Sequence, residues 1–276
     1  KFKSIQHQTP LQTLILARIP DYLNLLKRVA FQLTKGRQIP KVPDDPMVRW
    51  WADLMKSSYP KTPPAQMDTD DLAVILYSGG TTGVPKGIML SNMNFISEGK
   101  MVSEWGKLDN ATSVLAILPI FHGFGLGVCV NACFMGGGKS ILVPVFTPET
   151  VADLIRSRKP SFVIGVPTLF DALSRNPKMQ KADLSCLKAT FSGADALPRP
   201  VKERFEEMVR RQGGNVQLLE GYGLTEAVTA IMATPIGCYR EGSVGVPFPD
   251  MLAKIVRLDT TDEAPVGEEG EICVSG

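Results

Sequence analysis

The middle of the chain alternates short apolar runs, which predict strands, with amphipathic segments, which predict helices. The predicted strands are residues 113–119, 140–145, 161–165, 187–191 and 215–219. The predicted helices are an apolar, small-residue segment that ends near residue 135, followed by residues 148–158, 168–174 and 200–212. Repeated strand–helix units predict an α/β fold with doubly wound, mostly parallel sheets and helices on both faces.

The helix at residues 148–158 has the clearest start signal. Thr147 can cap its N-terminus, Pro148 suits the first helical position, and Glu149 lies in the first turn. Pro160 then limits its extent, because the residue before a proline disfavours helical geometry. We therefore predict a helix that ends near Arg158.

Both ends of the chain differ from the middle. Short β-like runs at residues 252–258 and 270–274 predict the start of a small antiparallel β subdomain, so we divide the chain into an α/β core, residues 1–242, and a β segment, residues 243–276. Residues 21–34 predict a basic amphipathic helix, which we expect to pack on its own domain, although peripheral membrane contact stays open. The chain lacks an initial Met and ends after a strand pattern, so we interpret it as part of a longer protein.

Composition narrows the class of protein. The chain has 276 residues, of which 44% are hydrophobic, so it can form a sizeable core. A net charge of +2 gives no support for nucleic-acid binding. Five Cys without paired spacing and only two His argue against a zinc site and favour reduced thiols. The most apolar stretch, residues 113–135, contains Pro119, His122 and Asn131, which would be costly in a bilayer. We therefore expect a cytoplasmic protein.

A Ser/Thr/Gly-rich loop, residues 78–87, follows an apolar run at residues 72–77 that predicts a buried strand. Hydroxyl groups and successive backbone N–H groups can bind anionic oxygens, and Lys86 adds a positive charge. The loop does not match the common P-loop pattern, because Gly87 stands where that pattern has Ser or Thr. It predicts a phosphate-binding loop of another type.

A second motif, residues 220–226, follows the predicted strand 215–219. Gly221 and Gly223 permit a tight turn and close approach of a ligand. Tyr222 offers a flat face for a base, Thr225 a hydroxyl, and Glu226 a carboxylate of the kind that binds Mg²⁺. Alone, the motif is also compatible with an ordinary turn in which Thr225 caps a helix.

Together the two motifs resemble the signature loops of the adenylate-forming (AMP-binding) superfamily, which includes acyl-CoA synthetases, luciferases and non-ribosomal adenylation domains. Residues 119–125, 165–168 and 192–198 are weaker matches in the family's order, and the resemblance runs from about Asp70 to the end. It implies a two-step reaction: a carboxylate attacks the α-phosphorus of ATP to give acyl-AMP and pyrophosphate, and a thiol, usually that of coenzyme A, then takes the acyl group.

The resemblance also implies a role for each matching position. The pyrophosphate part of ATP would be bound by Ser78, Gly79, Gly80, Thr81, Thr82, Gly83 and Lys86. The adenine site would comprise Gly193, Ala194, Asp195, Glu220, Gly221, Tyr222 and Gly223, with Tyr222 stacking on the base. Thr225 would contact the α-phosphate, and Glu226 and Thr81 would hold Mg²⁺. The catalytic residues would be Lys86, His122, Thr225 and Glu226.

The acid itself would lie among His122, Phe124, Gly125 and Val166. No carboxylate follows His122 to pair with a substrate ammonium, and an unpaired buried ammonium is costly. We therefore expect a fatty acid rather than an amino acid, since the resemblance is greatest to medium- and long-chain fatty acyl-CoA synthetases. Aryl acids and a carrier-protein acceptor stay open. His122 is also compatible with a core histidine bonded to a backbone carbonyl.

The family continues beyond the position of Gly276, with a ribose-binding Asp and a small C-terminal lobe that carries a catalytic Lys. We therefore expect this chain alone to bind ATP weakly and to adenylate poorly. Two other classes stay open: a nucleotide-binding regulatory fragment without catalysis, and a structural α/β module without a nucleotide site.

Overall fold

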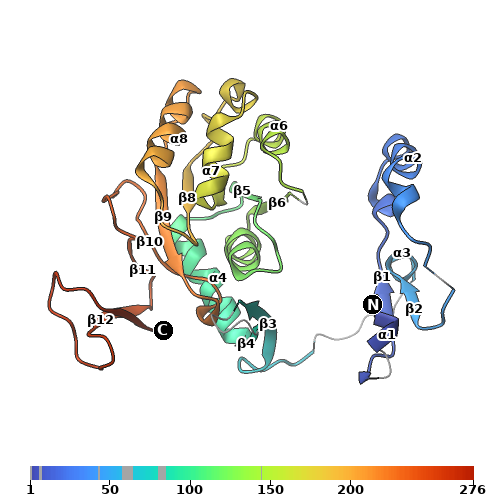
Figure 1. Cartoon of the computed structure of the whole chain (residues 1–276), viewed down its shortest axis with the longest axis horizontal. Coiled ribbons are helices and arrows are strands. Elements are labelled where there is room, and N and C mark those ends of the chain that lie inside the picture. Colours follow the sequence, from blue (N-terminus) through green and yellow to red (C-terminus); the bar gives the residue numbers. More distant parts are fainter. Residues whose placement is uncertain (1, 6–7, 43, 58–64, 80–84, 144) are drawn as a thin grey trace. The chain divides into compact units, whose positions relative to one another are not determined.

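The computed structural model of the protein describes residues 2–5, 8–42, 44–57, 65–79, 85–143 and 145–276. The chain forms two compact units, residues 1–66 and 67–276, and Figure 1 shows the elements of each. The division predicted at residues 242 and 243 is a different one and stays a prediction. The two units are described separately, and the second one carries the candidate site.

The first unit contains short elements only. In chain order they are α1 (Phe2–Ile5), β1 (Leu14–Leu16), η2 (Ile19–Tyr22), α2 (Leu25–Leu33), η3 (Lys35–Gln38), β2 (Val48–Trp50) and α3 (Trp51–Leu54), with β1 and β2 paired in parallel. The helix predicted over residues 21–34 is confirmed for Leu25–Leu33, but its predicted start is wrong. Leu23 is extended, and Asn24 caps α2 by accepting a hydrogen bond from the Lys27 amide. No residue of α2 is buried, so its packing partner stays a prediction.

The second unit is built on a seven-stranded sheet in the order β11-β10-β9-β8-β7-β5-β6. The strands are β5 (Ser113–Ala116), β6 (Lys139–Leu142), β7 (Phe162–Gly165), β8 (Ala189–Ser192), β9 (Leu218–Gly223), β10 (Ala230–Ala233) and β11 (Val246–Pro247). The pairs from β9 to β6 are parallel, and β10 is antiparallel to both β9 and β11. The prediction of a mostly parallel sheet is confirmed.

The helices of this unit are α4 (Asn92–Gly106), the π-helix η4 (Phe124–Ala132), α5 (Cys133–Met135), α6 (Pro148–Arg158), α7 (Pro167–Arg175), η5 (Met179–Lys181), α8 (Arg199–Arg211) and η6 (Thr225–Ala227). The predicted start and end of α6 are confirmed. The Thr147 hydroxyl accepts a hydrogen bond of 3.1 Å from the Thr150 amide, as expected of an N-cap.

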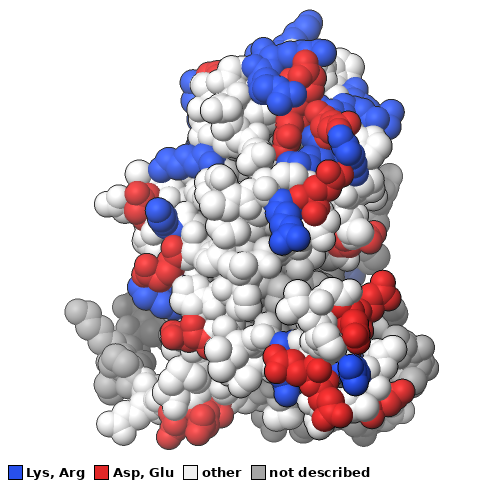
Figure 2. Space-filling view, turned by 90° about the vertical axis from the view of Figure 1, so that its left-hand side faces the viewer, with Lys and Arg blue, Asp and Glu red and all other residues white. Residues whose placement is uncertain are grey.

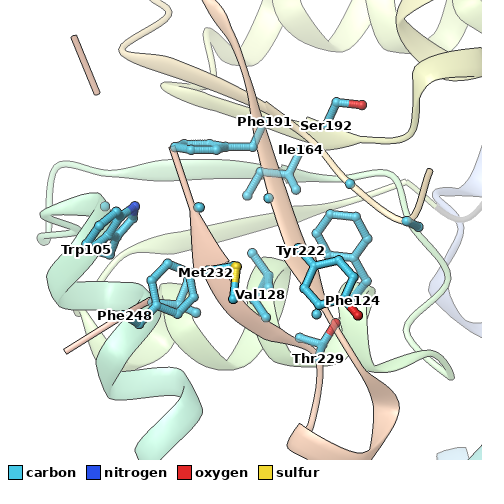
Figure 3. Close-up of a pocket in the computed structure, with 18 of the residues that line it drawn as sticks. Trp105, Phe124, Val128, Ile164, Phe191, Ser192, Tyr222, Thr229, Met232 and Phe248 are labelled. Carbon is cyan, nitrogen blue, oxygen red and sulfur yellow. The ribbon is translucent and has the colours of Figure 1, made fainter. Parts of the chain in front are cut away.

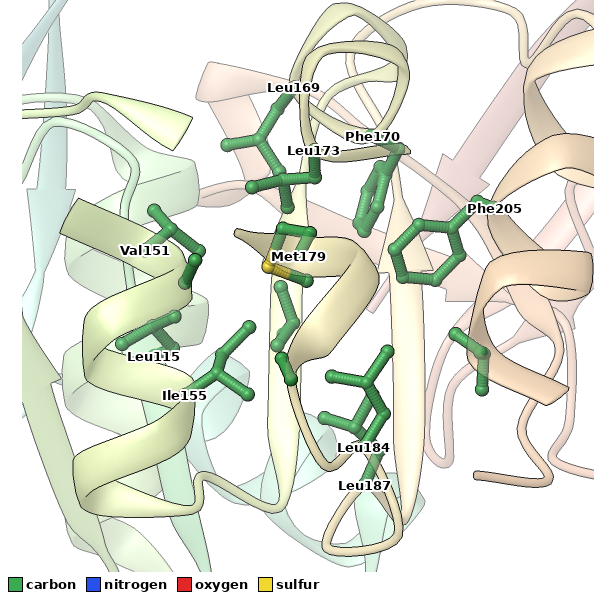
Figure 4. Close-up of a cluster of buried hydrophobic side chains, with 14 of the residues drawn as sticks. Leu115, Val151, Ile155, Leu169, Phe170, Leu173, Met179, Leu184, Leu187 and Phe205 are labelled. Atoms are coloured by element: carbon green, nitrogen blue, oxygen red, sulfur yellow. The ribbon is translucent and has the colours of Figure 1, made fainter. Parts of the chain in front are cut away.

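Helices lie on both faces of the sheet. Side chains alternate from face to face along each strand, so the same strands contribute to two cores. Leu115 and Val163 point into a core with α6, α7 and α8, shown in Figure 4. The Phe170 and Phe205 rings meet there edge to face, with 4.9 Å between their centroids. Residues adjacent in sequence to Leu115 and Val163, such as Phe162, point to the other face and pack in a second core with α4 and η4.

Two hairpins complete the unit: β3 (Leu72–Ser78) with β4 (Lys86–Ser91), and β12 (Leu252–Val256) with β13 (Glu271–Ser275). The latter agrees with the predicted antiparallel segment near the C-terminus. The prediction of a buried strand at residues 72–77 is wrong, since only Leu76 in that run is buried. The hairpin is a separate two-stranded sheet with one packed face, so its apolar sequence is half exposed.

The outer surface of α8 carries charges of both signs, which Figure 2 shows on the face that it views. Arg199 pairs with Glu203 at 2.7 Å and Arg211 with Glu207 at 2.8 Å. These pairs are exposed and contribute little to stability. Within the described ranges, no helix is both long and apolar enough to cross a membrane.

Candidate active site

A cavity of about 280 Å³ lies beside β8, β9 and β10, and Figure 3 shows the residues around it. Eight of the residues predicted for the nucleotide and acid sites line it: His122, Phe124, Gly193, Ala194, Gly221, Tyr222, Gly223 and Thr225. They come together because β5, β8 and β9 are parallel, so the segments that follow their carboxyl ends meet at one edge of the sheet.

His122 lies in the segment after β5, with an exposed side chain. Its Nδ1 accepts a hydrogen bond of 3.1 Å from the Phe124 amide. In the neutral imidazole the proton then belongs to Nε2, which is left to donate to a ligand. This geometry differs from that of a core histidine bonded to a backbone carbonyl.

The predicted turn at Gly221–Gly223 is wrong, because these residues are part of strand β9. At Gly223 a glycine is required for another reason, whereas a methyl group on Gly221 would make only ordinary contacts. A methyl group on Gly223 would collide with the Thr229 carbonyl oxygen of the antiparallel neighbour. This close approach of β9 and β10 presents Tyr222 to the cavity together with Phe124, as Figure 3 shows.

The three acidic residues predicted for the nucleotide and metal sites, Asp195, Glu220 and Glu226, do not line the cavity. A Glu220 carboxylate oxygen accepts a hydrogen bond of 3.3 Å from the Leu197 amide, so Glu220 connects β9 to the segment before α8. Asp195 is exposed and accepts from the adjacent Ala196 amide at 2.8 Å.

Glu226 is exposed in η6. Among the described residues it forms no ion pair within 4.0 Å, and its carboxylate suits a hard cation such as Mg²⁺. Thr81, its predicted partner as a metal ligand, lies outside the described residues. In the described ranges, no group of three or more His, Cys, Asp or Glu side chains could hold a metal ion by itself.

The predicted phosphate loop connects β3 and β4. Ser78 and Lys86 are paired across the hairpin, next to its tip, and both Gly79 and Lys86 are exposed. The central residues of this prediction lie outside the described part of the chain: Gly80, Thr81, Thr82 and Gly83. Strands β3 and β4 contact η6, so the hairpin lies close to Thr225 and Glu226.

Two residues predicted for the acid pocket do not line the cavity. A methyl group on Gly125 would collide with the Pro119 carbonyl oxygen, so this glycine serves close backbone packing. Val166 packs against the core on the other side of the sheet.

The apolar end of the cavity is formed by residues that the sequence patterns did not single out. They are Val102, Trp105, Leu108, Val114, Phe162, Ile164, Met232 and Phe248. The Trp105 and Phe248 rings are 5.2 Å apart between centroids and close this end, as Figure 3 shows. Val102 and Trp105 share a face of α4 by their spacing, but no local pattern relates them to Phe248.

A buried carboxyl group lies one layer behind the cavity wall. Glu98 of α4 is 1% exposed, and among the described residues neither of its side-chain oxygens has a hydrogen-bond partner of normal geometry. Burial raises its pKa to about 8, and the nearby Ala230 amide and Asn131 side chain oppose this rise only in part. A buried, unpaired carboxyl group is costly, so the neutral form is favoured.

The fold and the cavity define an α/β protein with a ligand site at the carboxyl edge of a parallel sheet. The chain belongs to the AMP-binding enzyme family, whose model matches residues 13–276.

It is 35% identical over 273 residues to the long-chain-fatty-acid–CoA ligase of Bacillus subtilis, covering 95% of this chain and 47% of that protein. It is 33% identical over 210 residues to the probable 4-coumarate–CoA ligase 3 of Dictyostelium discoideum, covering 75% of this chain and 38% of that protein. The crystal structure of ATP-bound MatB from Rhodopseudomonas palustris matches with a TM-score of 0.75 at 26% identity, covering 95% of this chain and 50% of that one. The chain thus spans about half the length of the curated long-chain-fatty-acid–CoA ligases that it matches.

Proposed function

We propose that the protein activates a carboxylic acid with ATP, releasing pyrophosphate, and then transfers the acyl group to coenzyme A. One observation carries this proposal: the same cavity is lined by His122, Tyr222 and Thr225 and by an extended apolar wall. An acid bound along the apolar wall would present its carboxylate to the end where the motif residues lie. Membership of the AMP-binding family supports the proposal.

The side chains suit the charges that develop in the first step. Tyr222 would stack on adenine, and Thr225 and the Nε2–H group of His122 would donate hydrogen bonds at the α-phosphate and carboxylate. Lys86 would offset negative charge on the departing pyrophosphate, as cationic groups do in phosphoryl transfer. Glu226 would hold Mg²⁺, which supplies further charge stabilisation when bound.

The preferred acid in this proposal is an unbranched aliphatic acid of medium length. Apart from His122, none of the residues that line the described cavity carries an ionisable acid or base other than the Tyr222 phenol, so a second charge on the acid would be left unpaired. The volume of about 280 Å³ is near the low end for small-molecule sites. The Bacillus relative is named for long-chain fatty acids, which agrees with the chemical type.

An aryl acid is the second candidate. Trp105, Phe124, Phe191 and Phe248 offer flat walls to a ring, and the Dictyostelium relative is named as a probable 4-coumarate–CoA ligase. Acyl transfer to a carrier protein instead of coenzyme A is compatible with the same first step.

The test is acid-dependent ATP–pyrophosphate exchange by the full-length protein, with straight-chain acids of graded length and with cinnamic acids. Lys86→Ala should lower the exchange rate on the order of 100-fold, since this is the typical loss of one preorganised charge-stabilising donor. Lys100→Ala is the matched control, because Lys100 is also exposed and forms an ion pair with Glu104 on the same helix. ATP binding without exchange for any acid would indicate a regulatory nucleotide-binding protein, and no ATP binding would indicate a structural module.

A further inference from the structure

We propose that Val228 is a positioning residue that fixes three segments of the site against one another through a strained backbone turn. The inference rests on the proposed function, since it assigns Val228 to the same site. Val228 directly follows η6, which carries Thr225 and Glu226, and it directly precedes Thr229 of the cavity wall.

The backbone at Val228 has an unusual conformation. Its φ is 67° and its ψ is −61°, and the Thr229 amide donates a hydrogen bond of 2.8 Å to the Ala227 carbonyl. This is a γ-turn of the rare, strained kind. A positive φ is most unfavourable for a β-branched residue, and Val228 is the one such residue among the described non-glycine residues with positive φ.

Strain of this kind persists only where the surroundings over-determine the conformation. The Val228 side chain is 1% exposed and is buried with Leu76 and Leu90 of the β3–β4 hairpin. Leu126 of η4 packs against the same cluster. The side chain therefore joins the phosphate-loop hairpin to the π-helix.

The Val228 carbonyl oxygen makes a further close contact, with the backbone at Gly123. A methyl group on Gly123 would collide with the Val228 carbonyl oxygen and would lie 3.2 Å from a Leu76 methyl carbon. Gly123 is the neighbour of His122, so the residue after His122 must be small for the turn to fit. Three candidate segments thus meet at one residue: the hairpin that carries Ser78 and Lys86, the His122 segment, and the Thr225–Glu226 segment.

The consequence for the reaction is geometric. Lys86 would act on the pyrophosphate, and His122 and Thr225 on the adjoining α-phosphate and carboxylate, so the three side chains must keep their relative positions. A misplacement of about 1 Å can cost two orders of magnitude in rate. If the turn relaxed, η6 would move relative to the hairpin. The strain at Val228 is therefore expected to serve the relative position of these side chains rather than the stability of the fold.

Val228→Ala and Val228→Gly in the full-length protein separate these two roles. Both variants lose the buried side chain, but glycine also relieves the positive φ. The melting temperature of Val228→Gly should therefore equal or exceed that of Val228→Ala. The exchange rate should have the opposite order, with Val228→Gly slower than Val228→Ala by on the order of 10-fold. The KM for the acid should change less than kcat, because the apolar wall is intact.

Val163 provides the matched control. It is a buried valine of β7 whose side chain packs in the other core. Val163→Gly should melt below Val163→Ala, as expected where the backbone is unstrained, and both should retain exchange in proportion to the folded fraction. Val228→Thr keeps the β-branched shape but buries a hydroxyl among apolar side chains, so it should melt below the wild type. Its folded molecules should retain exchange within about threefold of the wild type, which provides a readout if the smaller variants do not fold.

The inference would be overturned if the exchange rates of the residue-228 variants had the same order as their melting temperatures. A higher melting temperature for Val228→Ala than for Val228→Gly would also overturn it. A wild-type protein without exchange for any acid would overturn the proposed function instead. In that case the order of the melting temperatures still decides whether the turn is strained.

Discussion

Replacement of Glu98 by glutamine should change how the stability of the protein depends on pH. Glu98 is buried with no hydrogen-bond partner of normal geometry among the described residues, and burial raises its pKa from an ordinary value of 4.5 to about 8. A carboxyl group with a raised pKa in the folded state binds its proton more tightly there than in the unfolded chain. Its favourable contribution is therefore complete below pH 4.5 and is lost as the pH rises toward 8.

The size of the effect follows from the two pKa values. Each pKa unit corresponds to about 1.4 kcal/mol. Between pH 5 and pH 8 the folded state holds this proton and the unfolded chain does not, so the free energy of unfolding should fall by about 3.5 kcal/mol because of this group. Glu98→Gln keeps the shape and cannot ionise. Its own unsatisfied amide adds a cost that does not depend on pH.

Guanidinium chloride unfolding between pH 5 and pH 8.5 measures this difference. As the pH rises from 5 to 8, the free energy of unfolding of the wild type should fall relative to that of Glu98→Gln, and the difference should level off above pH 8. Glu104→Gln is the control, because Glu104 lies on the same helix but is exposed and paired with Lys100 at 2.8 Å. The nearby Cys129 thiol does not titrate in this range, since burial raises its pKa to about 12. Parallel curves for the wild type and Glu98→Gln would refute the reasoning.

Three further predictions concern single side chains. Tyr222→Ala should weaken ATP binding by about 1–3 kcal/mol, the usual value of stacking on a base, while Tyr222→Phe should bind as the wild type does; calorimetry distinguishes them. Phe170→Ala should destabilise the fold by about 3–5 kcal/mol in denaturant unfolding, because this ring is fully buried against Phe205. Iodoacetamide at pH 8 should label exposed Cys238 and spare Cys129, as mass spectrometry would show.

The local elements of the second unit follow closely from the sequence. The parallel strands read as short apolar runs because both of their faces are buried, and α6 carries its cap and its proline at the predicted positions. The prediction was wrong for β3, whose apolar run belongs to a hairpin with one exposed face. An apolar run alone does not reveal whether a second layer covers the strand.

The site is predictable where the chemistry is local. His122, Tyr222 and Thr225 stand in motifs, and the cavity brings them together. Trp105 and Phe248 could not be found this way, because their contact depends on how α4 crosses the sheet. Gly125 shows a related limit of local patterns: a glycine next to a candidate site can serve backbone packing as well as an open pocket.

The π-helix η4 has a consequence for how this chain tolerates insertions and deletions. A π-helix closes its hydrogen bonds over one more residue than an α-helix, so the segment Phe124–Ala132 has more residues per turn than an α-helix. Loss of one residue there could be absorbed by conversion to α-helix. The turns beyond the deletion would then keep nearly the same orientation, because an α-helix uses fewer residues per turn. Phe124 and Val128, which both line the cavity, are four residues apart and share a face of an α-helix as well, so loss of one residue after Val128 should shorten the segment while preserving this wall of the cavity.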